Sequence, residues 1–256
     1  MASKHYTRLT EAQASFDEMI QRFGVVTVMD VKVYDTQDVL KALYGTGDNL
    51  KFDGTKTACD IRKVLGDKNS SGENIAKPIC ELDTLKTSNI TEEGPTKTVT
   101  GGQNSSPLLK FGKTARLEMQ DALGNAEALE ALGGMTVEYE AKSEPNVLSS
   151  RFAVHASDTY GGPKTLLGTS FFINQKNGAQ VPVEILIYQF LPDSIFNLSQ
   201  DAEGDATVFD MNGDLIGTKV ALGDNSGNPI KKNLFYSILK ENIGHQAEEE
   251  PTKQSV

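Results

Sequence analysis

The chain has 256 residues, a formal net charge of −10 and a hydrophobic content of 38%. This length suffices to bury the core of one large domain or of two small ones. Lys and Arg never occur in runs longer than two residues. Ordinary DNA-binding proteins cluster such cations to contact the phosphates, so the composition of this acidic chain excludes that class. The charge serves general solubility, and it also suits a wall past which DNA slides without adhering. With a mean hydropathy of −0.35, much of the chain is expected in polar loops or on surfaces covered on assembly.

Cysteine and histidine are too sparse for a metal centre. The two cysteines, Cys59 and Cys80, form no C-x-x-C pair, and His5, His155 and His245 lie far apart in sequence. A zinc site needs four closely organised ligands, which this spacing does not supply. Two free thiols suit a reducing cytoplasm, with a Cys59–Cys80 disulfide as the alternative.

Neither end of the chain nor its interior predicts a targeting or membrane segment. The first six residues lack the apolar stretch of a secretion signal. The longest apolar run, 183–191, is interrupted by Glu184 and Gln189 and is too short to span a bilayer. We therefore expect a soluble protein without membrane contact.

The first predicted element is a helix from Thr10 to Gly24. Thr10 and Gln13 form a capping-box pattern, and Gly24 suits the left-handed residue after a helix. Its apolar residues follow helical spacing and form one face: Phe16, Met19, Ile20 and Phe23. The β-branched, partly alternating residues 25–34 then predict a strand.

Residues 35–77 are predicted to form a long polar loop. They are rich in Gly, Asp, Lys, Asn and Ser, and only Ile61 to Leu65 would suit a turn of helix. A loop of this length inside a domain is usually functional or interfacial, so we expect an excursion from the sheet.

Short strands separated by turn residues are expected in most of the remaining chain. The expected strands are 79–85, 96–100, 115–119, 135–139, 152–155, 166–173, 181–191, 194–198, 206–211 and 215–222. Asn177-Gly178 and Asn212-Gly213 are the strongest hairpin turns. Residues 125–132 predict a short helix ended by Gly133-Gly134, and 233–243 fit a helix somewhat better than a strand.

These patterns predict a mainly β fold of two packed antiparallel sheets, sandwich-like or barrel-like, with two or three short flanking helices. Residues 1–244 are expected to form one domain, with the 35–77 excursion inside it. The acidic tail, 245–256, has nothing to bury and should be disordered.

The residues that resemble catalytic or metal-binding groups are better explained by structural roles. Asp210, Asn212 and Asp214 resemble the start of a calcium loop, but Leu215 and Ala221 stand where such a loop needs Gly and Glu. An Asn-Gly hairpin turn explains the same residues.

The other candidates are equally weak. The glycine–lysine clusters 161–164 and 217–219 predict turns, and His155 predicts a half-buried strand residue without support from Asp158. The carboxylate pairs Glu118/Asp121 and Glu138/Glu140 are typical of a solvated face. We predict no catalytic, cofactor-binding or metal-ligating residue, no cofactor and no enzyme activity.

Six segments carry a resemblance to a known family. They are ELDTLKTSNI (81–90), GGQNSSPLLKFGK (101–113), TARLEMQDAL (114–123), YGGPKT (160–165), LPDSIF (191–196) and DAEGDATVFD (201–210). In order and character they resemble the major tail, or tail tube, proteins of tailed bacteriophages. The 35–77 excursion departs from the compact members of that family.

The resemblance implies a virion structural protein. It implies rings, commonly of six subunits, whose inner sheets join into one barrel and which stack through loops and terminal segments into a tube. The expected partners are the protein itself, other tail proteins and genomic DNA passing through the lumen without specific binding. The expected location is the virion tail, assembled in the host cytoplasm. Alternatives are a baseplate ring, a capsid decoration protein, or a β-sandwich module that binds calcium or carbohydrate.

Overall fold

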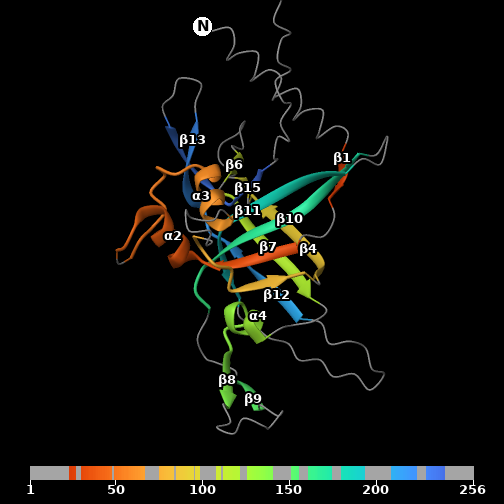
Figure 1. Cartoon of the computed structure of the whole chain (residues 1–256). Helices are drawn as coiled ribbons and strands as arrows, with labels where there is room; N and C mark the ends of the chain where they lie inside the picture. Colours follow the sequence, from red (N-terminus) through yellow and green to blue (C-terminus); the bar gives the residue numbers. More distant parts are fainter. Residues whose placement is uncertain are drawn as a thin grey trace, which may run out of the picture.

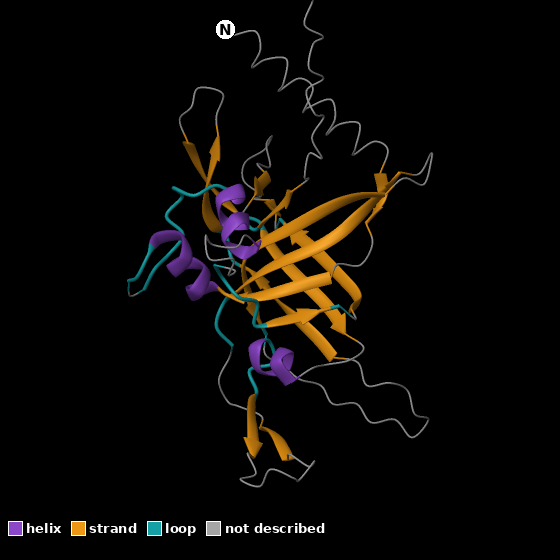
Figure 2. Cartoon of the chain, in the orientation of Figure 1, coloured by secondary structure: helices purple, strands orange, loops and turns teal. Residues whose placement is uncertain are grey.

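A computed structural model describes residues 23–26, 30–47, 49–66, 75–83, 85–94, 96–98, 108–110, 112–121, 126–140, 151–155, 161–174, 180–193, 209–223 and 229–239. The fold is mainly β with few short helices, as predicted (Figure 2). The helices are α2 (Thr36–Tyr44), α3 (Ala58–Gly66) and α4 (Ala126–Ala131). The strands are β1 (Phe23–Val26), β2 (Asp30–Asp35), β3 (Cys80–Leu82), β4 (Leu85–Glu93), β5 (Thr96–Thr98), β6 (Leu108–Lys110), β7 (Thr114–Asp121), β8 (Thr136–Glu140), β9 (Arg151–His155), β10 (Lys164–Asn174), β11 (Gln180–Pro192), β12 (Phe209–Leu215), β13 (Thr218–Gly223), β14 (Pro229–Leu234) and β15 (Tyr236–Leu239).

One antiparallel sheet of nine strands forms the body of the molecule (Figure 1). Its order is β3-β2-β10-β11-β12-β7-β4, with β1 beside the far end of β10 and β15 beside β11. Its most extensive strand pairing is the hairpin β10–β11, in which Ile173 lies opposite Gln180. The strands flanking Asn177-Gly178 are therefore confirmed as a hairpin, while the turn itself lies outside the described residues.

The sheet curls so that its two halves pack on each other. Strands β2, β3, β10 and β11 form one half, and β12, β7 and β4 form the other. Both halves and α4 contribute side chains to one buried cluster, whose largest members include Leu82, Leu117, Met119, Leu166, Ile187 and Phe190. Each such side chain stabilises the fold by roughly 1.5–3 kcal/mol. The predicted pair of packed antiparallel sheets is thus confirmed, as two halves of one sheet.

Three residue pairs between β11 and β12 join the two halves in the described part of the sheet. Phe190, Leu191 and Pro192 at the end of β11 lie opposite Leu215, Asp214 and Gly213 of β12, in that order. A Cβ on Gly213 would stand 2.6 Å from Cε2 of Phe190 and would also overlap the carbonyl oxygen of Leu191. The predicted hairpin turn at Asn212-Gly213 is therefore wrong. Glycine is needed there because two strands approach closely, not because the chain turns.

Helices α2 and α3 cover the outer face of the β2–β10–β11 half. Tyr34, Leu167, Leu186 and Tyr188 from the sheet share a second buried cluster with α2, α3 and β13; the covering residues include Val39, Leu40, Ile61, Leu65 and Val220. The Arg62 guanidinium on α3 reaches Glu184 on β11 through two hydrogen bonds of 2.5 and 2.7 Å. The prediction of a polar loop over 35–77 is therefore wrong, since two nine-residue helices within this segment dock on the sheet.

Of the remaining predictions, some are confirmed, some are wrong and some fall outside the described residues. The helix at 125–132 is confirmed as α4, followed by Gly134 at a φ of 63°. The helix favoured for 233–243 is wrong as far as 239, because β14 and β15 occupy those residues. The N-terminal helix lies outside the described residues up to residue 22, and Phe23 and Gly24 belong to β1 instead. The expected strand 194–198 and the tail 245–256 also lie outside. Cys59 is exposed, Cys80 is buried, and neither forms a disulfide.

The hydroxyl of Tyr34 makes a pH-dependent link between the sheet and α3. It donates to the Leu65 carbonyl at 2.7 Å, and burial raises the pKa of Tyr34 to about 12. The native state holds this proton more tightly than the unfolded chain, whose Tyr titrates near 10. Stability from Tyr34 is therefore complete below pH 10 and is lost as the pH rises toward 12.

We expect Tyr34→Phe to lower the free energy of unfolding by about 1–3 kcal/mol at pH 8, because the buried Leu65 carbonyl loses its donor. Between pH 10 and 12 the wild type should lose up to roughly 2–3 kcal/mol more than this variant. Urea unfolding at several pH values measures both quantities. Tyr44→Phe, at a half-buried tyrosine, is the control. Parallel pH profiles for wild type and Tyr34→Phe would contradict the assignment.

Candidate functional site

The outer face of the β4–β7–β12 half is open to solvent and entirely polar. Strand residues alternate between faces, so Ala115, Leu117 and Met119 of β7 point into the core while their neighbours point out. We call the outward set the acidic sheet face: Thr87, Asn89, Thr91, Arg116, Glu118, Gln120, Asp210, Asn212 and Asp214, with Asp193 beside them.

The register of the three strands orders this face into cross-strand rows. The rows are Thr91–Arg116–Asp214, Asn89–Glu118–Asn212 and Thr87–Gln120–Asp210. Neighbouring side chains in such rows lie close enough to interact across the strands. The face is thus a regular polar surface, with no apolar side chain in any row.

Arg116 is the single cation of the face and lies among three carboxylates. Its guanidinium contacts Asp193 at short range, Asp214 at 3.3 Å and Glu118 at 3.9 Å. The hydrogen bond that Arg116 donates to Asp193, followed by the charges of Asp193 and Asp214, raises the Arg116 pKa above its usual value. The fourth carboxylate, Asp210, accepts a hydrogen bond of 3.0 Å from the Gln120 amide. Four carboxylates and one guanidinium leave the face with a net charge of −3.

The residues that resemble a calcium loop lie on this straight strand. Asp210, Asn212 and Asp214 are two residues apart along β12, so their side chains are spaced about 7 Å from one another on one face. Asp210 and Asp214 are engaged by Gln120 and Arg116. They do not wrap around a common point, and no group of three or more metal-binding side chains occurs within the part of the chain that the structure describes.

The other candidate residues are scattered. His155 is exposed rather than half-buried as predicted, because the hairpin β8–β9 stands clear of the core; its Nε2 lies 3.1 Å from Glu138. Glu118 and Glu138 are solvated, and Gly161 and Gly217 lie in the short connections before β10 and β13. Lys164, expected in a turn, is instead buried and ion-paired with Asp35 at 3.1 Å. Apart from the exposed pair His155 and Glu138, the structure brings none of these residues together.

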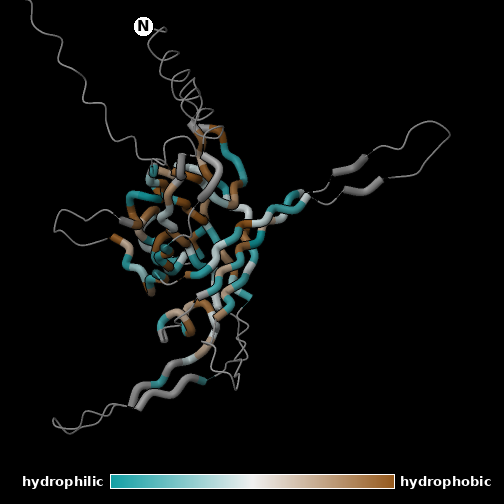
Figure 3. The backbone as a smooth tube through the Cα atoms, turned by 90° about the vertical axis from the view of Figure 1, so that its right-hand side faces the viewer, coloured by the Kyte–Doolittle hydropathy of each residue, from teal (hydrophilic) through white to brown (hydrophobic). Residues whose placement is uncertain are grey.

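Strand β4 is a long edge of the sheet. Its nine residues pair with β7 on one side, and no strand in the described ranges pairs with the other. The hairpins β5–β6 and β8–β9 each form a two-stranded sheet outside the body (Figures 1 and 3). A free edge pairs readily with another chain, and an isolated two-stranded hairpin is marginally stable in water. These features are typical of a chain that associates with further copies.

A pocket of about 480 Å³ lies between the start of α2, the segment 49–52 and the start of β13. We call it the basic pocket, because Lys51 and Lys219 line it and none of its other described lining residues is acidic. Its remaining lining combines amides with apolar groups: Gln37, Asn49, Gln189 and Asn233 with Leu40, Leu50, Phe52 and Pro163.

The comparisons with known proteins add no assignment: no protein-family model matches the chain, and no curated protein is detectably similar to it. None of the helices in the described residues has the length and apolar character needed to cross a membrane.

Proposed function

We propose that the protein is a subunit of a bacteriophage tail tube, which assembles into stacked rings and forms the conduit for DNA ejection. In this proposal the acidic sheet face lines the channel. The subunits join through sheet edges, of which β4 is the longest that is free along one side. The protein acts as a wall and performs no chemistry.

The proposal rests on the β4–β7–β12 half of the sheet, which has an apolar inner face, a polar outer face and a free edge. Its inner face is anchored in the core by Ala115, Leu117 and Met119, and its outer face is wholly polar. Joining such halves edge to edge would give a closed surface that is polar on one side, and closure would remove the exposed edges.

The electrostatics of the face suit DNA in transit. Carboxylates and phosphates repel, and the repulsion extends over about 10 Å at 0.1 M salt. The face offers a single guanidinium, already surrounded by Asp193, Asp214 and Glu118, and no aromatic ring on which bases would stack. A surface of this kind confines DNA without holding it.

The direct test is negative-stain electron microscopy of the purified full-length protein, together with sedimentation velocity. The proposal predicts stacked rings with a central channel. A protein that stays monomeric over a wide concentration range would contradict it. Single rings that never stack would favour a baseplate ring, and low copy number in virions would argue against a tube subunit.

Charge reversal on the face tests its role in the channel. We expect Glu118→Lys/Asp210→Lys to assemble normally, because both side chains are exposed and outside the core. Tubes assembled with short duplex DNA should then retain it at 50 mM salt and release it above about 200 mM, as phosphate contacts do. Wild-type tubes should retain little DNA. The control Glu81→Lys/Asp83→Lys, in which charges are reversed at β3 on the flank of the sheet, should also retain little. Equal retention by both variants would contradict a channel-facing position.

A further inference from the structure

Charge is divided between two ends of this acidic protein. Residues 49–57 with β13 and β14 hold five Lys and one Asp, a net +4, whereas the whole chain carries −10. Residues 126–140, which cover α4 and β8, hold four Glu and neither Lys nor Arg, a net −4. Figure 1 places α3 and β13 toward one end of the molecule and α4, β8 and β9 at the opposite end.

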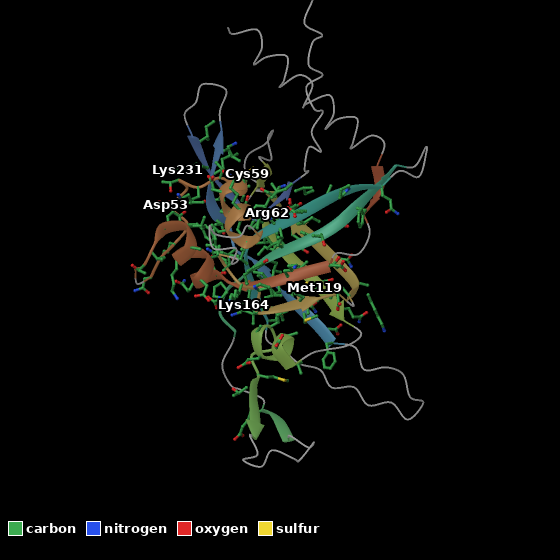
Figure 4. The ribbon with its side chains drawn as sticks, viewed as in Figure 1. Asp53, Cys59, Arg62, Met119, Lys164 and Lys231 are labelled. Atoms are coloured by element: carbon green, nitrogen blue, oxygen red, sulfur yellow. The ribbon has the colours of Figure 1, made fainter. Side chains whose placement is uncertain are left out.

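Three of the lysines at the basic end, Lys51, Lys219 and Lys231, form no ion pair with a described residue. Lys51 and Lys219 line the basic pocket. The Lys231 ammonium donates to the backbone carbonyl of Asp53 at 3.1 Å, and the two residues lie together in Figure 4. The Asp53 carboxylate instead accepts from the amide and hydroxyl of Thr55, at 2.8 and 2.6 Å. The basic end therefore presents open positive charge.

The opposite end projects as an arm made of α4 and the hairpin β8–β9, which we call the acidic arm. Helix α4 buries Ala128, Ala131 and Leu132 against the core and exposes Glu127 and Glu130. Neither glutamate is ion-paired within the described ranges. Beyond α4 the hairpin extends away from the sheet body (Figure 3). A two-stranded hairpin in this position gains its stability from a further contact.

We infer that the basic pocket of one copy receives the acidic arm of a second copy, with Lys51 and Lys219 facing Glu127 and Glu130. The inference rests on the proposed function, since it assigns the contact by which successive copies stack. The two surfaces differ, so the contact is heterologous and joins copies head to tail rather than in a two-fold pair. Opposite charge fixes the orientation, because a head-to-head contact would place like charges together.

Complementary charge reversals in the full-length protein test this contact. The first variant is Lys51→Glu/Lys219→Glu and the second is Glu127→Lys/Glu130→Lys. Each alone now presents like charges at the contact, so the fraction of protein in stacks should fall about tenfold or more. A 1:1 mixture restores opposite charges at every junction and should stack again. Lys32→Glu/Lys77→Glu, with the same change in net charge at exposed sites near β2 and β3, should stack as wild type does. Thermal unfolding confirms that each variant is folded.

The outcomes separate this inference from the proposed function. Single rings from each variant alone, and stacks from the mixture, support both. Stacks from both variants alone, or no recovery in the mixture, overturn the charge contact and leave the tube proposal standing. A wild-type protein that forms neither rings nor stacks overturns both.

Discussion

Gly213→Ala is expected to lower the free energy of unfolding by about 3 kcal/mol, which is a large part of the stability of a typical domain. Gly213 lies where β12 passes the end of β11, and an added Cβ would meet the Phe190 ring at 2.6 Å and overlap the Leu191 carbonyl. Phe190 is fully buried, so its ring has no free space to move into. Either the ring or the strand pairing must shift.

Urea denaturation of wild type and variant measures this effect. Gly217→Ala is the matched control, because an added Cβ there would meet nothing nearer than the Phe235 ring at 3.7 Å. It should change the free energy of unfolding by less than about 1 kcal/mol. Similar values for the two variants would contradict the close approach at Gly213. Since this join orients the acidic sheet face relative to the other half, Gly213→Ala should also impair assembly.

The strands were predictable where the pattern along the chain is local. Residues 166–173 and 181–191 combine β-branched and aromatic residues with flanking turn residues, and β10 and β11 follow that pattern closely. Leu166 and Leu167 are neighbours in β10 and belong to separate buried clusters, because successive strand residues point to opposite faces. Such patterns do not depend on what lies elsewhere in the chain.

The helices α2 and α3 were missed because their signals are short and sit in a polar segment. Asp35 accepts from the Gln37 amide at 2.8 Å, and Thr57 and Asp60 cap α3 reciprocally. These caps precede apolar residues at helical spacing, so a search for capping pairs would have found both starts. Helices of nine residues are marginal alone, and these two are stable because the sheet buries one side of each.

The acidic sheet face could not be located from sequence because it depends on contacts between distant segments. Arg116 and Asp214 meet across 98 positions of sequence, and the Glu118 row joins three strands. Alternation in β7 assigns Ala115, Leu117 and Met119 to the core, but it does not predict which strands lie beside β7. The prediction of a hairpin turn at Asn212-Gly213 is wrong for the same reason, since the close approach of β11 is a tertiary feature.

Asp35→Ala is expected to lower the free energy of unfolding by about 3–4 kcal/mol, because Asp35 caps α2 and pairs with a buried ammonium at once. Its carboxylate caps α2 through the Gln37 amide, and loss of such a cap costs about 1 kcal/mol. It also pairs at 3.1 Å with Lys164, which is only 8% exposed. An ammonium left buried without its carboxylate is strongly destabilising, by roughly 3 kcal/mol or more. Because α2 also forms a wall of the basic pocket, the variant should lose that surface as well.

Two further variants separate the charge from the cap. Asp35→Asn retains an oxygen for the Gln37 amide and removes only the charge, so it should be less destabilised than Asp35→Ala by about 1 kcal/mol. Asp35→Ala/Lys164→Met removes the orphaned ammonium and keeps its apolar stem, so it should recover about 2 kcal/mol relative to Asp35→Ala. Asp38→Ala, an exposed carboxylate on the same turn of α2, should cost less than about 1 kcal/mol. If the double variant is no more stable than Asp35→Ala, the buried charge is not what Asp35 compensates.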